Sequence, residues 1–292
     1  MILRIQNNFI TLLGTVTALL LSTTALSADS GTNSLSKAWN EVAYLNFRMA
    51  LPLFENTMKD SPENSAISYE AKLGLALCLH QQRPDTQNDK LRAAKLYDEL
   101  ITSSSNSHIR ATALLLRGRL FQLADYPGDQ PDPANAATLY HTILQDYPDS
   151  PCANEAALYL AQTAIFTMNV NAASNAVGNL KQWIIDHPRN PQAANQWMLI
   201  GMAQQQPLNN INAAIDAYTN AISCGLPPEE KKDILYWRIA SMAQKCGRTN
   251  LARDFYSRII TEIKRSSYSF MAQQRIREMG FKPPPLINPF DN

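Results

Sequence analysis

The chain has 292 residues, of which 45% are hydrophobic and 17% are charged, and its formal net charge is +1. This composition excludes an intrinsically disordered chain, and the absence of basic residues interleaved with aromatic ones argues against nucleic-acid binding. With only 10 glycines and many Ala, Leu and Gln, the chain favours helices over strands.

The first 27 residues have the pattern of a secretory signal peptide. Arg4 precedes an apolar run over residues 9–21, and small residues stand at the positions expected before a cut after Ser27. The run is shorter than the roughly 18 to 20 apolar residues that a spanning helix needs. We therefore predict a periplasmic or secreted protein that begins at Ala28, with no lipid-attachment cysteine near the cut and no later membrane span.

A small residue followed four positions later by a large apolar one recurs along most of the chain. Because positions i and i+4 lie on one face of a helix, each pair predicts a tight contact point beside an apolar plug. The alanines recur at a nearly constant interval of roughly 40 residues, which indicates a repeat architecture. The pairs are Ala50/Phe54, Ala93/Tyr97, Ala136/Tyr140, Ala176/Leu180, Ala214/Tyr218 and Ala252/Tyr256.

A second series of small residues runs between these pairs with a matching period. Because its interval follows that of the first series, each unit is predicted to hold two helices, A and then B. Prolines such as Pro148 and Pro188 follow helix B and are expected to end it. The small residues of helix A are Ala38, Gly74, Gly118, Ala161, Gly201 and Ala240.

These units resemble the tetratricopeptide repeat (TPR) family over residues 34–265. The match is strongest in the fifth and sixth units, where helix A has a large residue followed by an aliphatic–small pair. The resemblance implies an all-α fold, a right-handed α-solenoid of about six TPR-like helix pairs over residues 28–280, with a C-terminal capping helix over 267–279 that ends at Gly280. The residues that carry it are Trp197, Ile200, Gly201, Tyr236, Ile239 and Ala240 in helix A, and Ala214, Tyr218 and Ala221 in helix B.

The chain departs from the family pattern at several places. Longer A–B connections are expected at residues 83–89 and 125–133, and Trp183 stands where a small residue is usual. Pro52 lies inside the first helix B and should kink or delay it. The proline-rich tail, residues 281–292, could be a spacer, dock back on the fold or bind another protein, and we expect a spacer or disordered end.

The sequence contains no recognisable catalytic or metal site, and we predict no enzyme activity, metal or cofactor. None of the four histidines has a second ligand at helical metal spacing, and no carboxylate stands in an obviously apolar context. The acidic stretch over residues 124–135 lacks the alternation of a calcium loop and is predicted to be a polar turn. Among the four cysteines Cys78 is expected in the core, and we predict free thiols because none has metal spacing and because Cys224 and Cys246 should lie at opposite ends of their layer.

The TPR resemblance implies that helix A lines a concave groove for a partner polypeptide. Methionines there offer adaptable apolar contacts and amides offer hydrogen bonds. The lysines, arginine and asparagines with which some family members grip acidic C-terminal peptides are not found together here, and Trp197 and Trp237 are expected mainly to pack between helices. The predicted groove residues are Arg119, Gln122, Gln162, Met198, Met202, Gln205, Trp237, Ser241 and Gln244.

Residues 227–282 contain 12 Lys and Arg against 6 Asp and Glu, a local charge of +6. This basic third is compatible with an anionic component of the cell envelope, although a solvated helical exterior is the simpler interpretation.

Three functions remain open from the sequence. The junction at residues 147–156 is similar to the repeat junctions of outer-membrane-assembly lipoproteins and Tol–Pal coordinator proteins, which implies a non-catalytic protein-binding scaffold of the bacterial envelope. The alternatives are a helical accessory domain or enzyme acting on a polymer such as peptidoglycan, and a protein that stacks on other copies through its N-terminal end. A deep pocket with a buried, pKa-shifted carboxylate would favour the enzyme.

Overall fold

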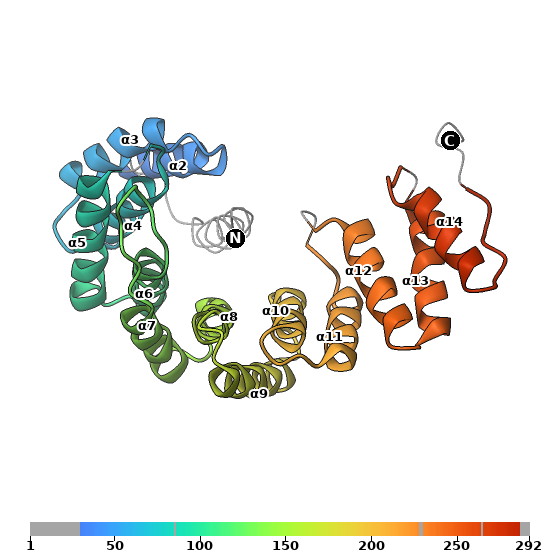
Figure 1. Ribbon diagram of the computed structural model, residues 1–292. Helices are drawn as coiled ribbons and strands as arrows, with labels where there is room; N and C mark the ends of the chain where they lie inside the picture. Colours follow the sequence, from blue (N-terminus) through green and yellow to red (C-terminus); the bar gives the residue numbers. More distant parts are fainter. Residues whose placement is uncertain (1–29, 85, 228–229, 264, 287–292) are drawn as a thin grey trace. The chain divides into compact units, whose positions relative to one another are not determined.

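The computed structural model describes residues 30–84, 86–227, 230–263 and 265–286, so the expected signal peptide lies outside the described part. Within these ranges the chain forms thirteen α-helices and no strand (Figure 1). The helices are α2 (Ser30–Ala43), α3 (Phe47–Asp60), α4 (Ala66–Gln81), α5 (Gln87–Ser103), α6 (Ser107–Gln122), α7 (Pro133–Asp146), α8 (Pro151–Ile165), α9 (Val170–Asp186), α10 (Ala193–Gln205), α11 (Ile211–Ser223), α12 (Lys232–Lys245), α13 (Thr249–Glu262) and α14 (Ser269–Glu278).

Neighbouring helices pack in sequence order from α2 to α7 and from α9 to α14. This confirms the predicted all-α solenoid of A and B helices. The contacts divide the chain into two compact units, unit 1 up to Thr163 and unit 2 from Ala164, so the boundary falls inside α8. No helix in the described ranges has both the length and the apolar character needed to cross a bilayer.

Side-chain caps begin most of the helices. The Ser65 hydroxyl accepts from the Ser68 amide at the start of α4, and Asn106 accepts from two amides of α6. Asp132 caps α7, with Pro133 directly after it. Each of these side chains satisfies an amide that has no partner inside the helix, which is why short polar residues stand at these positions.

Glycines of helix A lie against rings of helix B. A Cβ atom added to Gly118 would come within 2.5 Å of the Tyr140 ring, and one added to Gly201 within 2.5 Å of the Tyr218 ring. Gly74 differs, because an added Cβ would meet Phe54 of the preceding pair at 2.3 Å. The close approach therefore forms both within a pair and between successive pairs. All fifteen predicted packing residues are buried: Ala50, Phe54, Gly74, Ala93, Tyr97, Gly118, Ala136, Tyr140, Ala161, Gly201, Ala214, Tyr218, Ala240, Ala252 and Tyr256.

The turns from helix A to helix B share a left-handed residue that periodicity alone did not predict. Leu45, Met168, Asn209 and Gly247 have φ values of 63°, 58°, 50° and 72° in four of the six pairs. After Gly247, the amide of Arg248 donates to the Ala243 carbonyl at 2.8 Å and so closes the helix end. The other two pairs have the longer connections that were predicted.

The prolines end helix B as expected but do not disturb the first one. Helices α7 and α9 stop at Asp146 and Asp186, two residues before Pro148 and Pro188. The expectation that Pro52 delays α3 is wrong, because this helix begins at Phe47 and continues through the proline to Asp60.

The exposed residues of α2, at the start of the described chain, include Asn33, Lys37 and Asn40. Tyr44 and Leu45 directly after it are also exposed, and stacking on another copy through this end stays a prediction. At the other end, residues 281–286 pack against the fold, so the interpretation as a spacer is wrong for this part of the tail. Gly280 has a φ of 84° where the chain leaves α14.

Candidate functional site

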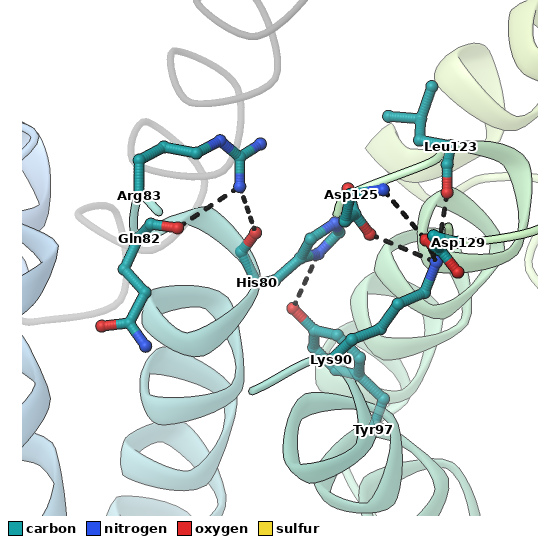
Figure 2. Close-up of polar contacts among 8 residues, drawn as sticks. All are labelled: His80, Gln82, Arg83, Lys90, Tyr97, Leu123, Asp125 and Asp129. Atoms are coloured by element: carbon teal, nitrogen blue, oxygen red, sulfur yellow. Dashed lines mark hydrogen bonds and ion pairs between the residues drawn. The ribbon is translucent and has the colours of Figure 1, made fainter. Parts of the chain in front are cut away.

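The acidic loop between α6 and α7 is tethered to α5 by one lysine (Figure 2). The Lys90 amine donates to the Leu123 carbonyl oxygen at 3.1 Å and contacts the carboxylates of Asp125 and Asp129. Burial alone would raise the pKa of Asp129. The hydrogen bond and positive charge of Lys90, together with the backbone hydrogen bonds from Asp125 and Gln130, outweigh burial and lower that pKa. The loop is thus a polar turn whose aspartates are held by the partly buried amine of Lys90 from α5, a contact that the sequence did not predict.

His80, in the last turn of α4, lies beside this tether and is only 3% exposed. Its Nδ1 atom is 3.5 Å from the Tyr97 hydroxyl (Figure 2). Burial, together with the positive charges of Arg119, Arg83 and Lys90, lowers the pKa of His80 to about 3. The imidazole is therefore neutral under ordinary conditions.

A second buried polar cluster joins α6, α7 and α8. The Gln122 Oε1 atom accepts from the Arg119 guanidinium at 2.6 Å and from the Tyr140 hydroxyl at 3.0 Å. The same guanidinium lies 4.1 Å from the centroid of the Tyr159 ring. Glu155 is 3% exposed beside this cluster, a burial that the sequence did not predict, because no carboxylate stands in an obviously apolar stretch of it. Burial raises the pKa values of Tyr140 and Tyr159 above their usual range.

The buried ionisable side chains of unit 1 are not accessible to a substrate. His80, Arg119 and Glu155 are all buried, and a general acid or base must come within hydrogen-bond reach of the group it serves. Burial also raises the pKa of Glu70, but this carboxylate accepts a hydrogen bond from the Trp39 indole at 3.0 Å. In the described ranges, no three His, Cys, Asp or Glu side chains are grouped so that they could hold a metal ion.

The predicted groove residues fall into two classes, one for each unit. In unit 1, Arg119 and Gln162 are buried, and Gln122 is held within the second cluster. In unit 2, Met202 is 40% exposed. The other unit 2 members are partly buried; they are Met198, Gln205, Trp237, Ser241 and Gln244.

Three of the predicted groove glutamines share a role that sequence reasoning missed. The hydroxyls of Tyr140, Tyr218 and Tyr256 on helix B donate to Gln122, Gln205 and Gln244 at 3.0, 3.3 and 3.1 Å. Each glutamine lies four residues after the small packing residue of its helix A, which is Gly118, Gly201 or Ala240. A glutamine four residues after this small residue was the signal in the sequence for this role. It predicts that the hydroxyl of the buried ring has a hydrogen-bond acceptor.

The exposed part of helix A in unit 2 mixes apolar and basic side chains. Ile234 and Arg238 are both exposed, and they lie four residues apart on α12, on one helical face with Ser241. Arg238 lies 5.6 Å above the Tyr218 ring. Trp237 packs against Tyr256 at 5.1 Å, as expected for a tryptophan between helices.

The four cysteines are free in the structure, as predicted. Cys78 and Cys152 are buried, and Cys224 and Cys246 are exposed where α11 and α12 end. Burial raises the pKa of the Cys78 thiol to about 12 and that of Cys152 to about 11, so neither is a reactive thiolate at neutral pH.

Comparison with protein-family models gives no match, and comparison with curated proteins gives none either. Among solved structures, the chain is similar to an assembly chaperone of RpL4, Acl4 (residues 1–338). The two chains are 14% identical with a TM-score of 0.46, and the match covers 86% of this chain and 98% of the other. The similarity is too loose for conclusions about one protein to be carried to the other.

Proposed function

We propose that the chain is a non-catalytic interaction scaffold of the bacterial cell envelope, which binds a partner polypeptide through the helix A surface of unit 2. We define this surface by Met202 on α10 and by Ile234, Arg238 and Ser241 on α12. The observation that supports it is the contrast between the units. The predicted groove residues Arg119 and Gln162 of unit 1 are buried, whereas Met202 and Arg238 of unit 2 are exposed.

The charges around this surface indicate what the partner carries. Arg248, Arg253, Arg258 and Arg275 form ion pairs with carboxylates of the same unit. Among the described residues, the ion pairs of unit 2 do not include Lys231, Arg238 or Lys245 of α12 and its start, whereas the charge of Lys232 acts on Glu262. A partner segment with acidic and apolar side chains complements such a surface, because methionine adapts to irregular apolar shapes and opposite charges speed encounter.

The location in the envelope is supported by the sequence alone. The signal-peptide pattern over residues 1–27 and the junction at residues 147–156 both favour an exported protein. An enzyme that acts on an envelope polymer is less well supported, because the described carboxylate with a raised pKa, Glu70, is bonded to Trp39.

The proposal is tested by purifying the full-length chain with its partner from the native envelope. Met202→Asp combined with Arg238→Glu should reduce the recovered partner at least tenfold, because both changes oppose the proposed contacts. Met198 is left unchanged because it packs against the core of unit 2.

The matched control is Ile185→Asp on α9, an exposed apolar residue outside the proposed surface. It should leave recovery unchanged, and circular dichroism should show equal helix content in all variants. Equal recovery of the same partner by the double variant would show that this surface is not the binding site.

A further inference from the structure

The start of the C-terminal tail makes specific contacts with the last two helices. The amide of Phe281 donates to the Ile276 carbonyl at 3.0 Å, and its ring packs beside the core of unit 2. The Arg253 guanidinium of α13 lies 4.9 Å from the centroid of this ring. The tail is therefore held by a ring contact before its prolines begin.

A buried glutamine of α14 then binds the backbone of the proline segment. Gln273 is 8% exposed, and its Nε2 atom donates to the Pro284 carbonyl oxygen at 2.9 Å. Its Oε1 atom accepts from Arg277 at 3.4 Å. Both ends of this buried amide are engaged, and the tail supplies the only acceptor that the described chain gives its NH₂ group. A buried amide that loses such a partner is destabilising, so the site favours an occupied state.

The chemistry of the contact suits an extended segment rather than a helix. Proline has no backbone N–H, so Pro283, Pro284 and Pro285 favour a polyproline conformation whose carbonyl groups remain free to accept. Such a segment is already extended before it binds, which lowers the conformational entropy lost on docking. The contact with Gln273 uses a backbone carbonyl, so it does not depend on a particular side chain at Pro284.

The position in the repeat explains why α14 is available for this contact. Ala272 is buried in α14, somewhat less than one repeat length after Ala240, which gives α14 the small packing residue of a helix A. The earlier A helices are each followed by a helix B, but α14 is followed by the tail. The tail thus covers a helix that has no B partner within the described residues.

We infer that α13 and α14 form a binding site for an extended proline-rich peptide, and that the chain's own residues 281–286 occupy it. Gln273 binds a backbone carbonyl of the segment, and Arg253 binds the ring that precedes the prolines. Because the tail is attached to α14 through Gly280, its effective concentration at the site is of millimolar order, so it excludes free peptide until it is released. This site is separate from the proposed partner surface on α10 and α12.

The test uses full-length chains and a fluorescein-labelled peptide with the sequence of residues 280–286, measured by fluorescence anisotropy. Phe281→Ala weakens the attached tail, so this variant should bind the peptide at least tenfold more tightly than the wild-type chain does. Adding Gln273→Leu to Phe281→Ala should remove that gain. Adding Gln274→Leu instead should preserve it, because Gln274 is the neighbouring amide, is exposed and bonds to Glu278.

Circular dichroism establishes that each chain keeps its helix content. If Phe281→Ala does not fold, Pro283→Gly combined with Pro285→Gly replaces it, because these changes loosen the attached tail and leave α13 and α14 unchanged. A folded, tail-weakened chain that fails to bind the peptide overturns the inference. Equal binding by the wild-type chain, or equal loss from the Gln273 and Gln274 changes, overturns it as well.

Discussion

Units 1 and 2 are built from the same helix pairs but have different interiors. Unit 1 contains the two buried charged residues of the described chain, Arg119 and Glu155, together with the neutral His80. The core of unit 2 is made of Ala, Ile, Leu, Met and aromatic side chains. The polar side chains buried in unit 2 are neutral amides, such as Asn190 and Gln196, which bond to each other at 2.6 Å. The notches of glycine against ring are equally close in the two units, at 2.5 Å for Gly118 and Gly201.

The difference separates two tasks that repeat proteins often combine. In the described residues, unit 2 stacks its helices without a buried charged side chain, so the buried charges of unit 1 are not needed for stacking as such. A buried charge is costly unless each of its bonds is made, so a network like that of Arg119 admits few alternative arrangements. Unit 1 therefore uses the predicted groove positions Arg119 and Gln122 to hold one packing, whereas Met202 at such a position in unit 2 is exposed.

The largest effect is expected from removing the buried cation of unit 1. Arg119→Met leaves Gln122 without its strongest donor and Tyr159 without its cation, and should lower the free energy of unfolding by about 3 kcal/mol. Urea denaturation measures this. The control is Arg117→Met on the same helix, which should cost less than about 1 kcal/mol because its partner Asp98 is exposed. Equal losses would mean that the buried network adds nothing beyond a surface pair.

A smaller loss is expected from filling a notch, and it should be the same in both units. Gly201→Leu forces the Tyr218 ring away and should cost about 2 to 3 kcal/mol, and Gly118→Leu should do the same against Tyr140. Gly178→Leu on α9 is the control, because an added Cβ there meets nothing within 4 Å. Thermal unfolding measures all three. Unchanged melting of the Gly201 variant would rule out the notch as a packing determinant.

The smallest of the three effects is a pH dependence carried by His80. Its pKa is about 3 in the folded chain and near 6.5 when unfolded, so below pH 6.5 the unfolded chain takes up the proton first. The stability that comes from keeping the His80 imidazole neutral is fully present above pH 6.5 and is lost as the pH falls toward 3. The loss amounts to about 2 kcal/mol by pH 5. Denaturation at pH 7.5 and pH 5 should therefore show a smaller acid loss for His80→Gln than for the wild-type chain.

The exposed His141 provides the control for this measurement, since His141→Gln should keep the wild-type pH dependence. If His80→Gln loses as much stability between the two pH values as the wild-type chain, then His80 does not carry the effect.

The repeat itself could be predicted from the sequence because it depends on local periodicity. Small residues at matched spacings, with a ring four positions later, place the same face of each helix inward wherever the helix lies. Prolines two residues after α7 and α9 marked the helix ends for an equally local reason, since proline cannot continue a helix. Pro52 does not follow this rule, because α3 continues past it to Asp60.

The candidate sites could be predicted only in part. Of the predicted groove residues, Met202 is exposed, whereas Gln162 is buried. The bond from Lys90 to Asp129 joins residues 39 positions apart, and no local pattern relates them. The docking of the tail on Gln273 depends in the same way on two segments whose spacing follows no period.

The sequence by itself therefore determined the helices, their order and the small residues at which they interlock, because each is set by contacts within a few turns of chain. Only the tertiary structure decided which polar side chains are buried together, which face of unit 2 stays open and where the tail lies. Burial of a polar group is a property of everything packed around it, and those neighbours come from helices that are distant in the sequence.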